Sequence, residues 1–160
     1  MLALLMLVTL SFVACNSKEG TNNNGPQHIV NTDIVGQWHL ISWNNQTPEF
    51  EVYLDIKEEG TFDIYQQTWS LYYEHFTGLC YLNDNIITGK YSDGKNWGAT
   101  SGYKAEVTKV GEEATLTLTN VDKPEDVSVY EQCTIPSDVK GATVKMTTRG
   151  EEMFEVVRFL

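Results

Sequence analysis

The sequence lacks any cluster of positive charge. Lys and Arg together number 11 against 22 Asp and Glu among 160 residues, which gives a net charge of −11 at pH 7, and the charges are scattered along the chain. An acidic surface of this kind repels the phosphates of nucleic acids. It also repels the anionic surface of a membrane. We therefore expect no nucleic-acid partner, and any membrane attachment must be covalent or hydrophobic.

The sequence also lacks the usual motifs of catalytic and metal sites. Its three histidines, His28, His39 and His75, are scattered, and no pair has metal-ligand spacing. No glycine-rich phosphate loop precedes a helix pattern, and no nucleophile elbow is present. The acidic residues fall mainly on the polar faces of the expected strands. These absences predict a protein that is not an enzyme and that holds no metal and no cofactor.

The first fourteen residues lack both charge and the length of a membrane-spanning helix. Residues 1–14 are almost wholly apolar, but they fall short of the ~20 residues that a spanning helix requires. They are typical of the apolar region of an export signal, and a buried first helix is the alternative. An export signal normally begins with Lys or Arg, and none precedes this run. We therefore expect that the true start lies upstream or is misplaced.

Residues 12–15, Phe-Val-Ala-Cys, close the apolar run. They resemble the cleavage box of bacterial lipoproteins, although Phe12 stands where Leu is usual. The resemblance implies that Cys15 is lipidated and becomes the mature N-terminus, since acyl chains contribute about 0.8 kcal/mol of membrane affinity per buried CH₂. An incidental cysteine in an ordinary signal is the alternative. Residues 15–33 are polar, which predicts a flexible tether ahead of one folded domain at 34–160.

Cysteine is scarce in this chain. Once Cys15 is assigned to lipid, Cys80 and Cys133 remain of the three cysteines. In an exported protein these two can form a disulfide, which would close a loop of about fifty residues and contribute roughly 4 kcal/mol. Two buried thiols are the alternative, because free cysteine is among the most buried residue types. The sequence leaves both open.

Residues 49–67 show the clearest structural pattern. Apolar and polar residues alternate over residues 50–57, which places every aliphatic side chain on one face of a strand. The turn at residues 58–60 ends in Gly60, where a positive φ is wanted, and Phe62 and Ile64 share one face of the returning strand. The pattern predicts an antiparallel hairpin. A lone hairpin is marginal in water, so further strands must cover its apolar face.

Short alternating segments with polar turns between them continue through the rest of the chain. One helical turn is expected from Pro136. Eight or nine sequential antiparallel strands predict an all-β, up-and-down barrel, which is just wide enough for packed side chains or for one small ligand. Besides the hairpin, the expected strands are 34–44, 68–82 with a bend at Gly78, 86–91, 103–110, 114–120, 127–135 and a less regular one within 142–160.

Aromatic residues supply the candidate ligand site. Trp69 and Tyr73 share a face of the strand expected at 68–82, while Trp97 and Tyr103 lie around an irregular loop at 95–102. Such residues can line or cap the mouth of a barrel, since ligand pockets are mostly apolar with a few polar groups. The alternative for each of them is core packing, because aromatic side chains dominate β cores.

Three stretches of the chain and its first strand carry a family resemblance. Gly36-Gln37-Trp38 at the head of a set of up-and-down strands resembles the lipocalins. Residues 50–62, residues 89–94 with Trp97, and residues 135–139 more closely resemble the lipocalin-like domain lipoproteins of Gram-negative gut bacteria, of the Bacteroides type. The resemblance implies a monomeric, lipocalin-like barrel that binds a small hydrophobic molecule. It also implies an outer-membrane lipoprotein of the cell envelope, on the periplasmic or the cell-surface face of that membrane.

The resemblance also assigns structural roles. Gly36 and Trp38 would mark the closed end of the barrel, with Trp38 packed across it. In lipocalins an arginine from late in the chain often covers this tryptophan, and Arg149 and Arg158 are the candidates here.

Two functional hypotheses follow from the sequence. In the first, the barrel binds a small hydrophobic ligand. In the second, its own side chains fill the barrel, and outer aromatic residues, Trp43, Tyr72 and Phe76, meet a protein or glycan partner. Room inside the barrel distinguishes them, because a ligand binder needs a cavity, whereas an interaction module is solid with an exposed apolar patch.

Overall fold

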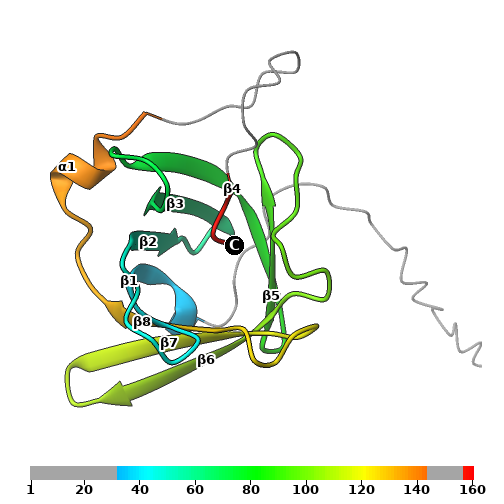
Figure 1. The fold of residues 1–160 in the computed structure, drawn as a ribbon. Coiled ribbons are helices and arrows are strands. Elements are labelled where there is room, and N and C mark those ends of the chain that lie inside the picture. Colours follow the sequence, from blue (N-terminus) through cyan, green and yellow to red (C-terminus); the bar gives the residue numbers. More distant parts are fainter. Residues whose placement is uncertain (1–31, 144–156) are drawn as a thin grey trace, which may run out of the picture.

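The computed structural model describes residues 32–143 and 157–160. Its eight strands form one closed antiparallel barrel, in which each strand pairs with its neighbours in sequence and β8 pairs with β1. Figure 1 shows them as a ring. The expected all-β, up-and-down barrel is therefore confirmed. The strands are β1 (Gly36–Trp43), β2 (Glu51–Ile56), β3 (Thr61–Gln67), β4 (Glu74–Asn83), β5 (Ile86–Tyr91), β6 (Tyr103–Val110), β7 (Glu113–Asn120) and β8 (Val127–Gln132).

Two short helices accompany the barrel, a 3₁₀ turn η1 (Thr32–Ile34) and α1 (Ser137–Lys140). The latter follows Pro136, as the sequence predicts. Ile135 and Val139 pack beside Tyr65 in a small cluster separate from the main core. Across residues 32–143 and 157–160, neither helix has the length and hydropathy of a membrane span.

The alternation of apolar and polar residues produces the core. Along β2 every second residue is buried, and β7 shows the same pattern. Because successive side chains of a strand point to opposite faces, one set fills the barrel and the other faces outward. Gly60 and Gly111 have φ of +80° and +64° in the turns after β2 and β6, a conformation that glycine adopts readily.

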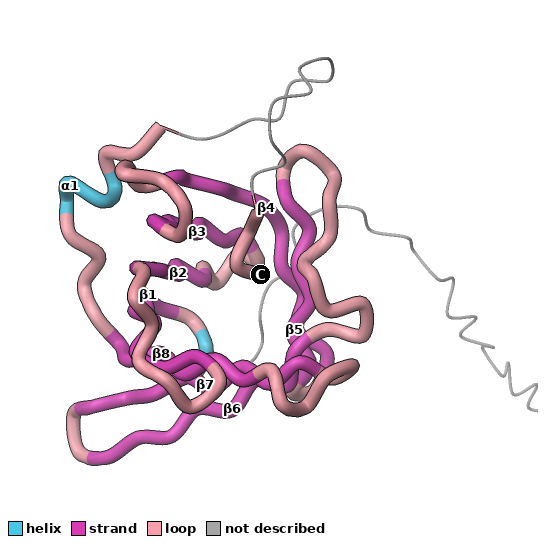
Figure 2. The backbone as a smooth tube through the Cα atoms, in the orientation of Figure 1, coloured by secondary structure: helices cyan, strands magenta, loops and turns pink. Residues whose placement is uncertain are grey.

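The two ends of the barrel differ. Because neighbouring strands are antiparallel, the short turns after β2, β4 and β6 lie together at one end, which we call the closed end. The longer connections, drawn in pink with the other loops in Figure 2, lie at the opposite end, which we call the open end. These connections are residues 44–50, 68–73, 92–102 and 121–126.

The chain crosses the closed end before it enters β1. Trp38 is fully buried, and its indole Nε1 donates a hydrogen bond to the carbonyl oxygen of Ile34 in η1 at 3.0 Å. Gly36 pairs with Ile56 at the start of β1. An exposed ion pair of 2.6 Å between Lys109 and Asp33 ties η1 to β6. The closed end is thus sealed by local structure around Trp38.

A loop residue fills much of the middle of the barrel. Trp97 comes from the connection between β5 and β6, yet its ring packs edge-on against Phe62 at 5.0 Å and Tyr103 at 6.1 Å between centroids. Its amide donates to the carbonyl oxygen of Gly89. A methyl group on Gly89 would lie 2.0 Å from the indole ring. Trp97 therefore occupies the space that a side chain on β5 would take.

The strand expected at 68–82 is shorter than predicted. β4 begins at Glu74, and the residues before it form a loop at the open end. Gln67 donates to the carbonyl oxygen of Leu71, and Ser70 accepts from the amide of Tyr72, which holds the loop in a tight bend. Gln66 pairs with Glu74 at the end of the β3–β4 ladder. The alternating aromatic residues before Glu74 therefore lie outside the paired strands.

The possible disulfide is not formed, because Cys80 and Cys133 are both free. Cys80 lies in the core on β4, whereas Cys133 follows β8 and packs in the outer cluster around Tyr65. In the closed order of strands, three strands separate β4 from β8 in either direction. Since a disulfide requires Cα atoms within about 7 Å, the barrel keeps the two thiols apart. Burial raises the pKa of Cys80 to about 12.

We predict that Gly89→Ala destabilises the barrel, because the added methyl group meets the Trp97 ring. The free energy of unfolding should fall by about 1–3 kcal/mol, the usual cost of overpacking a core. Gly98→Ala is the matched control, since a methyl group there lies 3.8 Å from the Tyr103 hydroxyl, and it should leave stability nearly unchanged. Urea unfolding of the two variants measures the difference. Equal stabilities would contradict the placement of Trp97.

Candidate functional site

Val157–Leu160 occupies the open end of the barrel; we call these four residues the 157–160 segment. Figure 1 draws it in red within the ring of strands. Gln66, a fully buried residue near the end of β3, holds its backbone. The side-chain amide nitrogen of Gln66 donates to the carbonyl oxygen of Val157 at 2.8 Å, and its amide oxygen accepts from the backbone N–H of Phe159 at 3.0 Å. The inward-facing Gln66 side chain thus forms its hydrogen bonds with a part of the chain that is distant in sequence.

Arg158 makes the most extensive contacts of the segment. Its guanidinium forms two hydrogen bonds with the carboxylate of Asp93, one of them at 3.1 Å. The guanidinium carbon also lies 4.2 Å from the ring centroid of Tyr91 and 5.0 Å from that of Phe76. The side chains of Arg158 and Asp93 are only 10% and 13% exposed. This is a bidentate ion pair stacked on two aromatic rings, an arrangement that suits arginine better than lysine.

The last two residues of the segment bind in apolar surroundings. Leu160 belongs to the main core, and its carbonyl oxygen accepts a 2.6 Å hydrogen bond from the hydroxyl of Tyr91. Burial raises the pKa of Tyr91 far above its ordinary value, so the hydroxyl stays protonated as a donor. Phe159 packs with Trp43 and Phe50 at centroid distances of 5.9 and 5.7 Å. Apolar packing therefore supports the polar contacts on both sides.

Two further features adjoin the segment. A pocket of about 310 Å³, a size within the usual range of small-molecule sites, opens beside Leu160. Tyr91 and the β5–β6 loop residues Lys95, Asn96 and Gly98 line it. Deeper in the barrel, the buried indole nitrogen of Trp97 has no hydrogen-bond acceptor among the described residues. A buried donor of this kind is rare in folded proteins and is often satisfied by water or a ligand. The open end thus combines apolar walls with several polar groups.

The structure does not bring the four expected ligand residues together. Trp97 and Tyr103 meet inside the barrel, where burial raises the pKa of Tyr103 to about 12. Trp69 is 85% exposed on the β3–β4 loop. Tyr73 packs against Tyr53 in the outer cluster, at 6.1 Å between ring centroids. The four residues therefore do not form one cluster, because the residues before Glu74 leave the barrel wall.

Arg158 also differs from the role that the lipocalin resemblance suggests. It stacks on Tyr91 and Phe76 at the open end, whereas Trp38 lies at the closed end. Arg149, the other candidate, lies outside the described residues. Phe76, expected to face outward as a partner contact, is buried in the core.

Sequence reasoning missed the residues that hold the segment. Gln66 carried a usable signal, because it follows Phe62 and Ile64 at inward positions of β3, where an apolar residue is expected. A buried amide needs partners, so its presence there indicates a polar contact inside the barrel. Asp93 and Arg158 gave no such signal, since they lie 65 residues apart and neither belongs to a motif.

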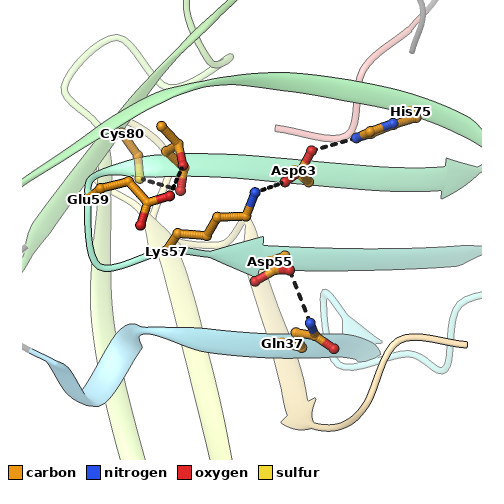
Figure 3. Close-up of polar contacts among 8 residues, drawn as sticks. Gln37, Asp55, Lys57, Glu59, Asp63, His75 and Cys80 are labelled. Atoms are coloured by element: carbon orange, nitrogen blue, oxygen red, sulfur yellow. Dashed lines mark hydrogen bonds and ion pairs between the residues drawn. The ribbon is translucent and has the colours of Figure 1, made fainter. Parts of the chain in front are cut away.

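A second polar group lies on the outer face of the barrel, shown in Figure 3. Asp63 on β3 forms 2.6 Å ion pairs with Lys57 and with His75 on β4, and Tyr65 stacks on the His75 ring at 4.2 Å. The hydrogen bond to Asp63 raises the pKa of Lys57. No group of three or more His, Cys, Asp or Glu suited to a metal ion occurs in residues 32–143 and 157–160. These contacts join neighbouring strands and stabilise the barrel wall.

Comparisons with known proteins do not assign a function. No family model matches the chain, and no curated protein matches it. A barrel of this kind serves many unrelated functions, so the fold alone does not assign one. The contacts at the open end are therefore the basis of the functional argument.

We predict that Arg158→Ala weakens the protein because it removes a bidentate ion pair, whose two side chains are 10% and 13% exposed, and its stacking on two rings. The free energy of unfolding should fall by about 3 kcal/mol, as expected when one partner of a buried pair is lost. Lys109→Ala removes the same charge from an exposed pair with Asp33, and should cost below about 1 kcal/mol. Thermal and urea unfolding compare the two variants. A loss for Arg158→Ala no greater than for Lys109→Ala would show that the 157–160 segment contributes little.

Proposed function

We propose that the protein is a non-enzymatic, monomeric binding protein that holds a small, largely apolar ligand at the open end of its barrel. The observation that supports this proposal is that the open end already binds a chain segment through a complete set of contacts. Gln66, Tyr91 and Asp93 supply polar groups, while Trp43 and Phe50 supply apolar walls. A few polar groups placed in an apolar concavity are the usual composition of a ligand site.

The ligand would take the place of the 157–160 segment. The barrel below the open end has little room for a ligand. Trp38, Phe62 and Tyr130 are among its fully buried side chains, and Trp97 packs between the strands. Residues 144–156 connect the segment to the rest of the barrel. The segment and a ligand would compete for one site, so binding would require the segment to leave.

The proposal also places the protein at the cell envelope, as an outer-membrane lipoprotein. The support is the sequence of residues 12–15, with Cys15 as the lipid-bearing residue; both lie outside the described residues. The described residues begin with η1, which lies at the closed end of the barrel, so a tether at 15–33 joins the barrel there. A tether joined there would leave the open end directed away from the membrane and accessible to a ligand.

Native mass spectrometry tests ligand binding directly. After incubation with a lipid extract of the host, the protein should carry a discrete adduct that organic extraction removes. Trp43→Ala should reduce the adduct at least tenfold, because Trp43 packs where the ligand would lie. Trp69→Ala is the matched control and should have no effect, since that side chain points into solvent. A clean protein mass for the wild type, with unchanged tryptophan emission, would contradict the proposal.

A second candidate function has its own observation. Trp69, Leu71 and Tyr72 on the β3–β4 loop are 85%, 86% and 79% exposed. Three neighbouring exposed apolar side chains are unusual on a solvent-facing loop and are typical of an interaction surface. In this alternative the barrel is filled by its own side chains, and the loop binds a protein or glycan. Loss of a partner in Trp69→Ala with no adduct in the wild type would favour it.

We predict that Cys15→Ala abolishes membrane attachment. The wild-type protein, expressed in a Gram-negative host, should enter the detergent phase on Triton X-114 partitioning, because its acyl chains favour an apolar environment. Cys15→Ala should remain in the aqueous phase. Cys133→Ala removes a cysteine from the barrel and should partition like the wild type. A wild-type protein found only in the aqueous phase would show that Cys15 carries no lipid.

A further inference from the structure

The contacts of the 157–160 segment have the character of peptide recognition. The Gln66 side chain pairs with the backbone on both sides of Arg158, as donor to residue 157 and acceptor from residue 159. A neighbouring β-strand offers an extended chain the same donor and acceptor pair. These two bonds depend on the backbone of the bound segment and not on its side chains. The open end therefore offers one hydrogen-bond donor and one acceptor to the backbone of a bound peptide.

Specificity comes from the Arg158 site. The carboxylate of Asp93 meets the guanidinium in two hydrogen bonds, and Tyr91 and Phe76 present their ring faces to it. Both charged side chains are nearly buried. A neutral ligand would remove an ion-pair partner from a buried carboxylate, which is unfavourable. A site of this kind discriminates strongly against ligands that lack the cation.

The residues after Arg158 define the rest of the pattern. Phe159 completes an aromatic group with Trp43 and Phe50. Leu160 enters the core, and the hydroxyl of Tyr91 binds its carbonyl oxygen. The bound sequence therefore consists of an arginine, an aromatic residue and an aliphatic residue in consecutive positions.

We propose that the open end is a peptide-binding site for segments that contain arginine followed by an aromatic and an aliphatic residue. The 157–160 segment occupies this site within its own chain, and a matching segment of another polypeptide binds when that segment leaves. This inference rests on the proposed function, because it assumes that ligands bind at the open end. It changes the expected ligand at the open end from a small apolar molecule to an arginine-bearing peptide.

Competition within the chain determines how the site must be tested. A segment tethered through residues 144–156 has an effective concentration on the order of millimolar, so it outcompetes a weakly binding free peptide. Arg158→Ala removes the charged contacts of the resident segment while leaving Gln66, Tyr91 and Asp93 in place. The full-length variant should therefore bind an external peptide that the wild type binds poorly.

The experiment compares two capped tetrapeptides, Val-Arg-Phe-Leu and Val-Ala-Phe-Leu, by isothermal titration calorimetry with the full-length Arg158→Ala protein. N-phenyl-1-naphthylamine, a neutral apolar dye, is the third probe. We expect the arginine peptide to bind at least tenfold more tightly than the alanine peptide, and at least tenfold more tightly than it binds the wild type. Adding Asp93→Asn should remove most of this preference. Adding Asp122→Asn, on the exposed β7–β8 loop, should not.

The outcomes separate this inference from the proposed function. If the dye binds but the two peptides bind equally, or Asp93→Asn has no effect on the preference, the arginine-peptide inference is overturned and binding at the open end stands. If neither peptide nor dye binds, both are overturned. Circular dichroism and cooperative unfolding establish that each variant is folded. Phe159→Ala, which weakens the resident segment at a different contact, replaces Arg158→Ala if the latter fails to fold.

Discussion

The limited room inside an eight-stranded barrel governs the rest of this structure. Such a barrel holds packed side chains or one small ligand. Here Trp97 folds inward from the β5–β6 loop onto Gly89 and meets Phe62 and Tyr103, so side chains fill the middle of the barrel. Trp38 and η1 seal one end. The open end is the remaining part of the barrel, and a segment of the same chain occupies it.

The polar groups at the open end explain why that segment binds there. Gln66, Tyr91 and Asp93 all direct hydrogen-bonding atoms to the 157–160 segment. Buried polar groups are costly unless they are paired, so whatever covers the open end must offer complementary partners. Water, a ligand or a peptide can do this, but they differ in how well they satisfy the carboxylate. Arg158 satisfies it with two hydrogen bonds and stacks on two rings.

The sequence predicts the barrel well because alternation of apolar and polar residues is a local signal. It predicts the hairpin at 49–67 and the six other strands for this reason, whereas Pro136 predicts α1. The same signal fails at Trp69 and Tyr73, since alternating aromatic residues continue past the point where β3 and β4 pair. The candidate site was less predictable. Arg158 and Asp93 meet only through the closure of the barrel, and Trp97 enters the core because Gly89 lacks a side chain, so no local pattern reveals either contact.

The central claim is that the 157–160 segment is bound inside the open end in solution. Hydrogen exchange at the backbone amide of Phe159 tests it most directly, because this N–H donates to the buried amide oxygen of Gln66. The account predicts exchange at least a hundredfold slower than in a free peptide of the same sequence, as for a hydrogen-bonded amide released only by local opening. It also predicts faster exchange in Gln66→Ala. Exchange at the free-peptide rate in the wild type would contradict the account.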